Sequence, residues 1–100
     1  MKIAELPKQN KIEKIFNKQN IVFAALFGSR AKRKNHRKSD YDFLVEFDNK
    51  DKYSLLDLVA LKNKLENILG KDVDLVTIQG LNPKIAAEIQ KSQKVIYDRR

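Results

Sequence analysis

The sequence contains no cysteine, few glycines and few prolines, and no long apolar run. Without cysteine, disulfide bonds and thiolate metal sites are excluded, and this composition fits the reducing cytoplasm. The longest apolar run covers residues 21–27, well short of the roughly 20 residues that a membrane span requires. The first residues include no apolar segment of signal-peptide length. We therefore expect a cytoplasmic protein that does not enter a membrane.

Nothing in the sequence divides the chain into parts. No internal repeat, low-complexity tract or linker interrupts its 100 residues, of which 42% are apolar. A chain of this length hides roughly 65% of the surface that its unfolded form exposes, which is enough for one modest core. The sequence therefore predicts a single domain over residues 1–100.

The charge of the chain is strongly positive. Lys and Arg number 21 against 13 Asp and Glu, a formal net charge of +8. Six of the nine residues in the segment 30–38 are basic and none is acidic. This favours an anionic partner, such as a nucleotide, nucleic acid or an acidic protein surface, although a solvated loop is the alternative. No aromatic residue is interleaved there for base stacking, and we assign Phe16, Phe47 and Tyr53 to packing.

Hydrophobic periodicity predicts alternating helices and strands. Ser54 and Asp57 form a capping-box pattern, Gly70 suits the end of a helix, and Asn82 followed by Pro83 suits a helix start. These signals indicate a small α/β (α+β) domain, in which helices pack on one face of a mixed β-sheet. The expected helices cover residues 7–20, 54–69 and 82–90, and the expected strands cover residues 21–27, 40–47, 73–78 and 95–97.

Two aspartates begin the second expected strand. Asp40 and Asp42 are two residues apart, so they project from the same face of an extended chain, opposite an apolar face. Two carboxylates so placed repel one another unless a cation or a proton lies between them. Magnesium commonly takes one or two protein carboxylates together with substrate phosphates. The alternative is that both residues simply occupy the solvated start of a strand.

Three further features favour a phosphate-binding metal site. Gly28 and Ser29 directly follow the first expected strand, where backbone N–H groups and a hydroxyl can hold a phosphate. Asp74 interrupts the apolar third strand, and a carboxylate there is costly to bury unless it is paired or bound to metal. The basic segment 30–38 has the charge expected of a chain that meets a polyphosphate.

These residues resemble a known motif. Gly28 and Ser29, ten intervening residues, the pair Asp40-x-Asp42 and the later Asp74 are similar to the pattern of the polymerase-beta-like nucleotidyltransferase superfamily. The closer resemblance is to the minimal nucleotidyltransferases (MNT), prokaryotic proteins of about this length. Many of these are antitoxins paired with a helical HEPN toxin. The likeness extends from about residue 21 to residue 97 and implies a palm-like sheet.

The resemblance also implies an activity and roles for six residues. It implies attack of an acceptor hydroxyl, a tyrosine of the HEPN partner, on the α-phosphorus of ATP, with release of pyrophosphate. Two Mg²⁺ ions would assist this reaction. Gly28, Ser29 and Arg30 would bind the phosphates. The metal ligands would be Asp40, Asp42 and Asp74, and Asp74 would also help to deprotonate the acceptor.

One position departs from the family pattern, and two other functions stay open. Arg33 stands where family members commonly have glycine, so a turn that needs a positive φ would be strained there. A binding module could neutralise its partner by contact alone, with an inactive site. A basic domain could instead bind nucleic acid through residues 30–38, with an affinity that falls steeply as salt rises.

Overall fold

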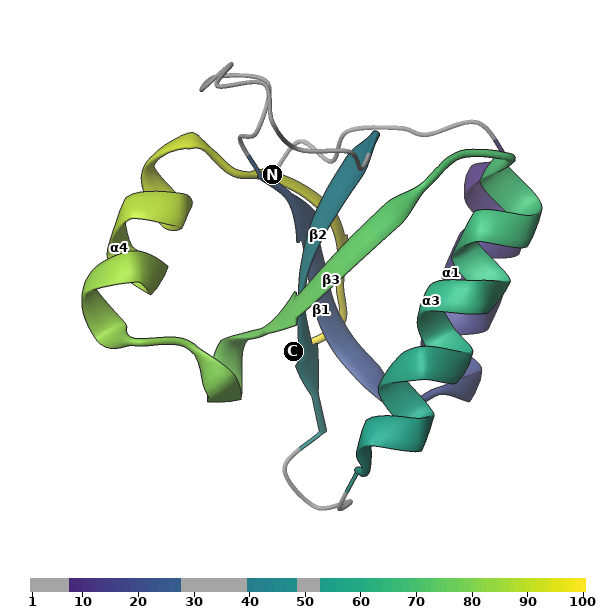
Figure 1. The fold of residues 1–100 in the computed structure, drawn as a ribbon, viewed down its shortest axis with the longest axis horizontal. Coiled ribbons are helices and arrows are strands. Elements are labelled where there is room, and N and C mark those ends of the chain that lie inside the picture. Colours follow the sequence, from purple (N-terminus) through teal and green to yellow (C-terminus); the bar gives the residue numbers. More distant parts are fainter. Residues whose placement is uncertain (1–7, 28–39, 49–52) are drawn as a thin grey trace.

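Four strands form one sheet in the computed structural model, which describes residues 8–27, 40–48 and 53–100 (Figure 1). Every helix and strand expected from the sequence is present, so the predicted α/β class is confirmed. The elements in chain order are α1 (Gln9–Lys18), β1 (Ile21–Leu26), β2 (Tyr41–Phe47), α3 (Leu55–Leu69), β3 (Val73–Thr77), the 3-10 helix η1 (Ile78–Gly80), α4 (Pro83–Ser92) and β4 (Lys94–Asp98).

The sheet is mixed, as predicted, with strand order β3-β2-β1-β4. β1 runs antiparallel to β2 and to β4, whereas β2 and β3 are parallel. A parallel pair needs a crossover connection, and α3 provides it. Helices α1 and α3 cover one face of the sheet, whereas α4 lies on the other side (Figure 1) and buries none of its residues. The expectation that the helices pack on one face is therefore correct for α1 and α3 and wrong for α4. Among the helices of the described ranges, none is long and apolar enough to cross a membrane.

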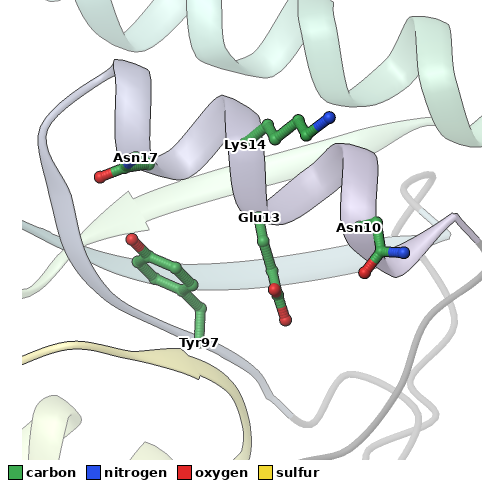
Figure 2. A pocket seen from close by; sticks show the side chains of 5 residues that line it. All are labelled: Asn10, Glu13, Lys14, Asn17 and Tyr97. Atoms are coloured by element: carbon green, nitrogen blue, oxygen red, sulfur yellow. The ribbon is translucent and has the colours of Figure 1, made fainter.

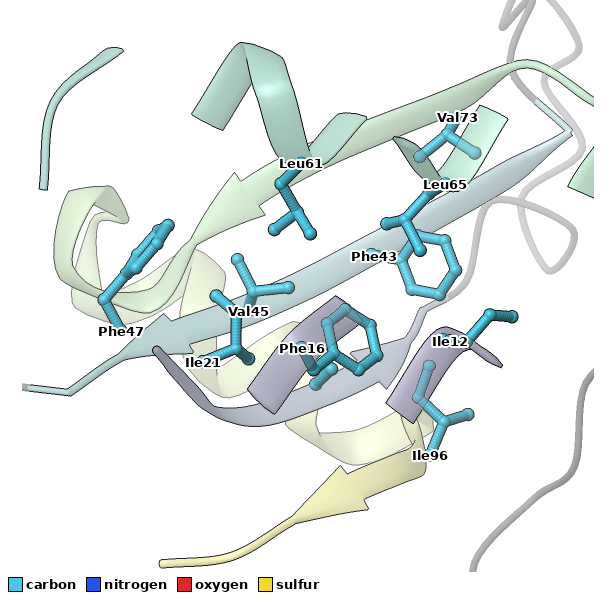
Figure 3. Packing of buried hydrophobic residues seen from close by; sticks show 11 residues of the cluster. Ile12, Phe16, Ile21, Phe43, Val45, Phe47, Leu61, Leu65, Val73 and Ile96 are labelled. Atoms are coloured by element: carbon cyan, nitrogen blue, oxygen red, sulfur yellow. The ribbon is translucent and has the colours of Figure 1, made fainter. Parts of the chain in front are cut away.

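The core lies between the sheet and the helices α1 and α3 (Figure 3). Phe16 of α1 meets the ring of Phe43 edge-on, with the ring centroids 6.3 Å apart. Phe47 stacks on Tyr53 at 4.1 Å. The assignment of Phe16, Phe47 and Tyr53 to packing is therefore confirmed, and the apolar face of β2 is the face that turns toward the helices.

Both predicted ends of α3 are confirmed. The Ser54 hydroxyl accepts a hydrogen bond from the Asp57 N–H at 3.3 Å, and the Asp57 carboxylate accepts one from the Ser54 N–H at 2.9 Å. Gly70 ends the helix with a φ of 67°, a left-handed conformation that suits glycine. The helical spacing of apolar residues over 54–69 predicts a buried stripe that includes Leu55 and Val59. This prediction is wrong at these two residues, which are 72% and 45% exposed. Within the described part of the chain, α3 packs against the core from Leu58 onward.

Arg100, just after β4, contacts residues of β1 and β2. Its guanidinium lies 4.1 Å from the centre of the Phe23 ring and forms ion pairs with Glu46 at 3.2 Å and Asp98 at 3.3 Å. Hydrogen bonds from the backbone N–H and then the side chain of Arg100 lower the pKa of Asp98. Because the pKa of Asp98 is lower in the folded state than in the unfolded state, ionised Asp98 stabilises the folded protein. This contribution is fully present above the ordinary aspartate pKa of about 3.9 and is lost as the pH falls through the lower pKa of the folded state.

We therefore expect Asp98→Asn to reduce the free energy of unfolding at pH 7 by up to about 1 kcal/mol, as is usual for partly exposed ion pairs. The difference from the parent should shrink as the pH falls below about 4. Urea unfolding at several pH values measures both quantities. Glu88→Gln, which alters a 3.6 Å pair with both side chains 74% exposed, should have little effect. A difference for Asp98→Asn that is independent of pH would contradict this account.

Candidate active site

Asp42 is the second residue of β2 and is almost completely buried. Its side chain points away from the helix-covered face because its neighbour Phe43 faces the core. Only 1% of Asp42 is exposed. A charged carboxylate loses its hydration on burial, and this costs several kcal/mol unless ionic or hydrogen-bonded partners compensate for the loss. β2 therefore holds, at a fixed place in the sheet, a carboxylate whose burial is unfavourable in itself.

Asp74 lies directly beside Asp42. The parallel register pairs the Cα atoms of Asp42 and Asp74, and register partners on neighbouring strands project from the same face. Asp74 is exposed, in contrast to Asp42. The structure therefore brings together one buried and one accessible carboxylate, both on the face opposite α1 and α3. A cation near this pair would reduce the repulsion between the two charges.

Asp40, the third predicted ligand, immediately precedes β2 and is exposed. Its N–H donates to the Asp72 carbonyl at 2.9 Å. Its carboxylate accepts a hydrogen bond from the Asp72 N–H at 3.4 Å. Across residues 8–27, 40–48 and 53–100, no three His, Asp or Glu side chains converge closely enough to hold a metal ion. The structure thus pairs Asp42 with Asp74, whereas the Asp40 side chain contacts the backbone of Asp72.

The donor chemistry of this site fits a magnesium ion. Magnesium prefers oxygen ligands and usually binds through one or two carboxylates, with substrate phosphates and water completing its octahedral shell. Asp42 and Asp74 already meet that number. Asp40 would add a third oxygen ligand if its carboxylate exchanged the 3.4 Å contact with Asp72 for the ion.

The predicted phosphate-binding residues Gly28, Ser29 and Arg30 lie outside the described residues, as does the basic segment 30–38. Phe27, the residue before Gly28, is described. The N–H of Phe27 donates to the carbonyl oxygen of Asp42 at 3.0 Å. The residue that precedes Gly28 is therefore hydrogen-bonded to the buried aspartate of the acidic pair.

Two residues near this site were not recognised from the sequence. The Lys62 ammonium donates to the Glu66 carboxylate at 2.8 Å, and the Val73 N–H donates to the same oxygen at 2.9 Å. These two bonds, in that order of importance, lower the pKa of Glu66. Glu66 raises the pKa of Lys62, and the charges of Asp72 and Asp74 add to this increase. The Lys–Glu spacing of four residues was the available sequence signal.

A shallow hollow of about 480 Å³ lies elsewhere, between α1 and β4 (Figure 2). Polar side chains from one side of α1 and the ring of Tyr97 from β4 line it. None of the three predicted metal ligands contributes to this hollow. Its lining residues are Asn10, Glu13, Lys14, Asn17 and Tyr97.

Comparison with known proteins identifies the family. Residues 10–100 match the model described as Polymerase beta, Nucleotidyltransferase. A Methanocaldococcus jannaschii protein, whose name proposes protein adenylyltransferase activity, is 42% identical over 89% of this chain and 91% of its own. A solved structure described as a proposed minimal nucleotidyltransferase is 30% identical over 87% of each chain, with a TM-score of 0.69.

A second solved structure has the same fold. It is the complex of the tri-AMPylated HEPN toxin of Shewanella oneidensis with an MNT antitoxin. The match has a TM-score of 0.67 and 24% identity, and it covers 91% of this chain and 70% of that chain. The family match, the curated relative and the paired carboxylates of β2 and β3 all agree. The chain is a nucleotidyltransferase that belongs to the polymerase beta family, and within it to the minimal nucleotidyltransferases.

Proposed function

We propose that this chain is a Mg²⁺-dependent protein adenylyltransferase. It transfers AMP from ATP to a tyrosine hydroxyl of a HEPN-type toxin and so acts as the antitoxin of that partner. The observation that supports this most strongly is the register that sets Asp42 beside Asp74 on one face. The name of the curated relative and the AMPylated toxin in the Shewanella oneidensis complex support the choice of AMP and of a HEPN partner.

In this proposal Asp40, Asp42 and Asp74 hold the magnesium. The ion supplies Lewis-acid stabilisation of the charge that develops on the phosphate oxygens. Asp42 is buried in the middle of the sheet, so its carboxylate is held rigidly. Asp74 is exposed, so an acceptor hydroxyl that approaches from outside can reach it. This difference in exposure makes Asp74 the more accessible carboxylate of the register pair for an incoming hydroxyl.

The transfer exchanges one phosphorus–oxygen bond for another. The acceptor oxygen forms a bond to the α-phosphorus of ATP while the bond from that phosphorus to the bridging oxygen breaks. Pyrophosphate leaves, and Asp74 takes the hydroxyl proton. Gly28 and Ser29 bind the phosphates, and Arg30 neutralises part of their charge. The hydrogen bond of 3.0 Å from the Phe27 N–H to the Asp42 carbonyl oxygen holds the residue before Gly28 next to the acidic pair.

Labelled ATP tests the activity directly. The chain is incubated with a HEPN-type helical protein as the proposed partner, Mg²⁺, and ATP labelled on either the α- or the γ-phosphate. We expect label on the partner from α-labelled ATP only, because AMP is transferred and the γ-phosphate leaves with pyrophosphate. Chelation of Mg²⁺, or replacement of the modified tyrosine by phenylalanine, should abolish labelling. A partner that remains unlabelled in the presence of Mg²⁺ would refute the catalytic proposal.

Neutralisation by contact alone is the second candidate. Leu55, Leu56 and Val59 expose apolar surface on α3, and exposed apolar patches commonly mark protein interaction sites. If contact suffices, a variant in which Asp40, Asp42 and Asp74 are all changed to Asn should still suppress the toxicity of the partner. If AMP transfer is required, the triple variant should co-purify with the partner without suppressing its toxicity.

A further inference from the structure

The beginning of β3 is held on the side that faces β2. The carbonyl oxygen of Asp72 accepts hydrogen bonds from the N–H groups of Asp40 at 2.9 Å and Tyr41 at 3.1 Å. These bonds start the parallel ladder that continues with the pairing of Asp42 and Asp74. The position of Asp74 therefore depends on how firmly the residues just before it are fixed.

The other side of β3 is the edge of the sheet, where N–H groups have no neighbouring strand to bond. There the Val73 N–H donates to the Glu66 carboxylate at 2.9 Å. Val73 directly precedes Asp74. Glu66 thus supplies, at this edge, the hydrogen bond that another strand would otherwise provide.

Glu66 is itself well anchored. Its carbonyl oxygen accepts the N–H of Gly70 at 2.8 Å, the bond that ends α3. Its carboxylate is bound to Lys62, one helical turn earlier, at 2.8 Å. Hydrogen bonds between charged groups are shorter and stronger than neutral ones. The last turn of α3 and the first residue of β3 are therefore joined through a single side chain, across a short connection.

We propose that Glu66 is a positioning residue for the metal-binding carboxylates, which fixes Asp74 opposite Asp42 by holding the backbone of Val73. Lys62 orients the Glu66 carboxylate for this role. The inference rests on the proposed function, because it assigns Asp74 to the Mg²⁺ site. Glu66 lies on α3, on the covered side of the sheet, so it acts through the backbone and does not contact the substrate.

Two substitutions at residue 66 separate positioning from charge. Glu66→Ala removes the acceptor of the Val73 N–H, whereas Glu66→Gln keeps an acceptor oxygen of nearly the same shape. Glu88→Ala is the matched control, because Glu88 also pairs with a lysine on a helix but is 74% exposed. Circular dichroism at the assay temperature verifies that each variant is folded.

Three quantities are measured for each variant. They are the Mg²⁺ concentration for half-maximal AMP transfer, the Mg²⁺-induced shift in melting temperature, and the rate of amide hydrogen exchange over residues 72–75. Removal of groups that orient metal ligands typically costs about 10–100-fold in metal affinity or activity. We expect Glu66→Ala to raise the Mg²⁺ midpoint by about tenfold and to accelerate exchange at Val73. Saturating Mg²⁺ should restore most of its kcat. Glu66→Gln should stay closer to the parent, and Glu88→Ala should match it.

The outcomes separate this inference from the proposed function. If the parent transfers AMP and Glu66→Ala has the same Mg²⁺ midpoint, the positioning role is refuted and the proposed function stands. If Gln and Ala impair Mg²⁺ use equally, the hydrogen bond to Val73 is not the cause, and the inference again fails. If the parent neither transfers AMP nor responds to Mg²⁺, the proposed function itself is wrong, and this inference falls with it.

Discussion

Asp42→Asn is expected to reduce the rate of Mg²⁺-dependent AMP transfer by at least about 100-fold. A metal ligand contributes several kcal/mol of transition-state stabilisation, and each 1.36 kcal/mol changes the rate by a factor of ten. Asparagine has almost the same shape as aspartate, so the fold should persist. The variant lacks the charge that attracts the cation. Its melting temperature should therefore respond less to Mg²⁺ than that of the parent, since a ligand stabilises a protein only as far as it binds the folded state.

Asp72→Asn is a matched control for this experiment. Asp72 lies two residues before Asp74, but its observed contacts with Asp40 and Tyr41 use backbone atoms and the Asp40 carboxylate. We expect Asp72→Asn to retain a rate near that of the parent, and Asp74→Asn to lose activity as Asp42→Asn does. Steady-state labelling with α-labelled ATP gives kcat and KM for each variant. Equal activity of Asp42→Asn and the parent would show that the assigned site is wrong.

Leu65→Ala should lower the free energy of unfolding by about 2–5 kcal/mol, the usual cost of truncating a buried leucine and leaving a cavity. Leu65 is completely buried between α3 and the sheet (Figure 3). A small domain has a total stability of only about 5–15 kcal/mol. This single change is therefore expected to remove a large share of it. Urea unfolding followed by circular dichroism measures the loss.

Leu56→Ala is the internal control, because it makes the same change on the same helix. Leu56 is 78% exposed, and surface substitutions usually change stability by less than about 0.5 kcal/mol. Comparable losses from Leu65→Ala and Leu56→Ala would contradict the packing of Leu65, and not Leu56, against the sheet. If the proposed toxin partner covers Leu56, the same variant should weaken the complex while leaving the isolated chain stable.

Much of the local structure follows from the sequence. The Ser54–Asp57 capping box and Gly70 define α3 because their hydrogen bonds and backbone angles involve only nearby residues. The alternation of β2 separates a core-facing side from an acidic side for the same reason. The exposure of Leu55 and Val59 could not be predicted in this way. Helical periodicity shows which residues share a face but not how far along the helix the core extends.

The candidate site, too, is only partly predictable from the sequence. The sequence by itself determined which acids are available and that Asp74 falls within a strand. That Asp40 shares a face with Asp42 stays a prediction, because Asp40 lies just before β2. Only the tertiary structure decided that β3 lies parallel to β2 in the register that sets Asp74 against Asp42, and that Glu66 holds Val73. Strand pairing joins segments that are distant in the chain, and its register depends on the packing of α3 beneath both strands, so no short-range pattern specifies it.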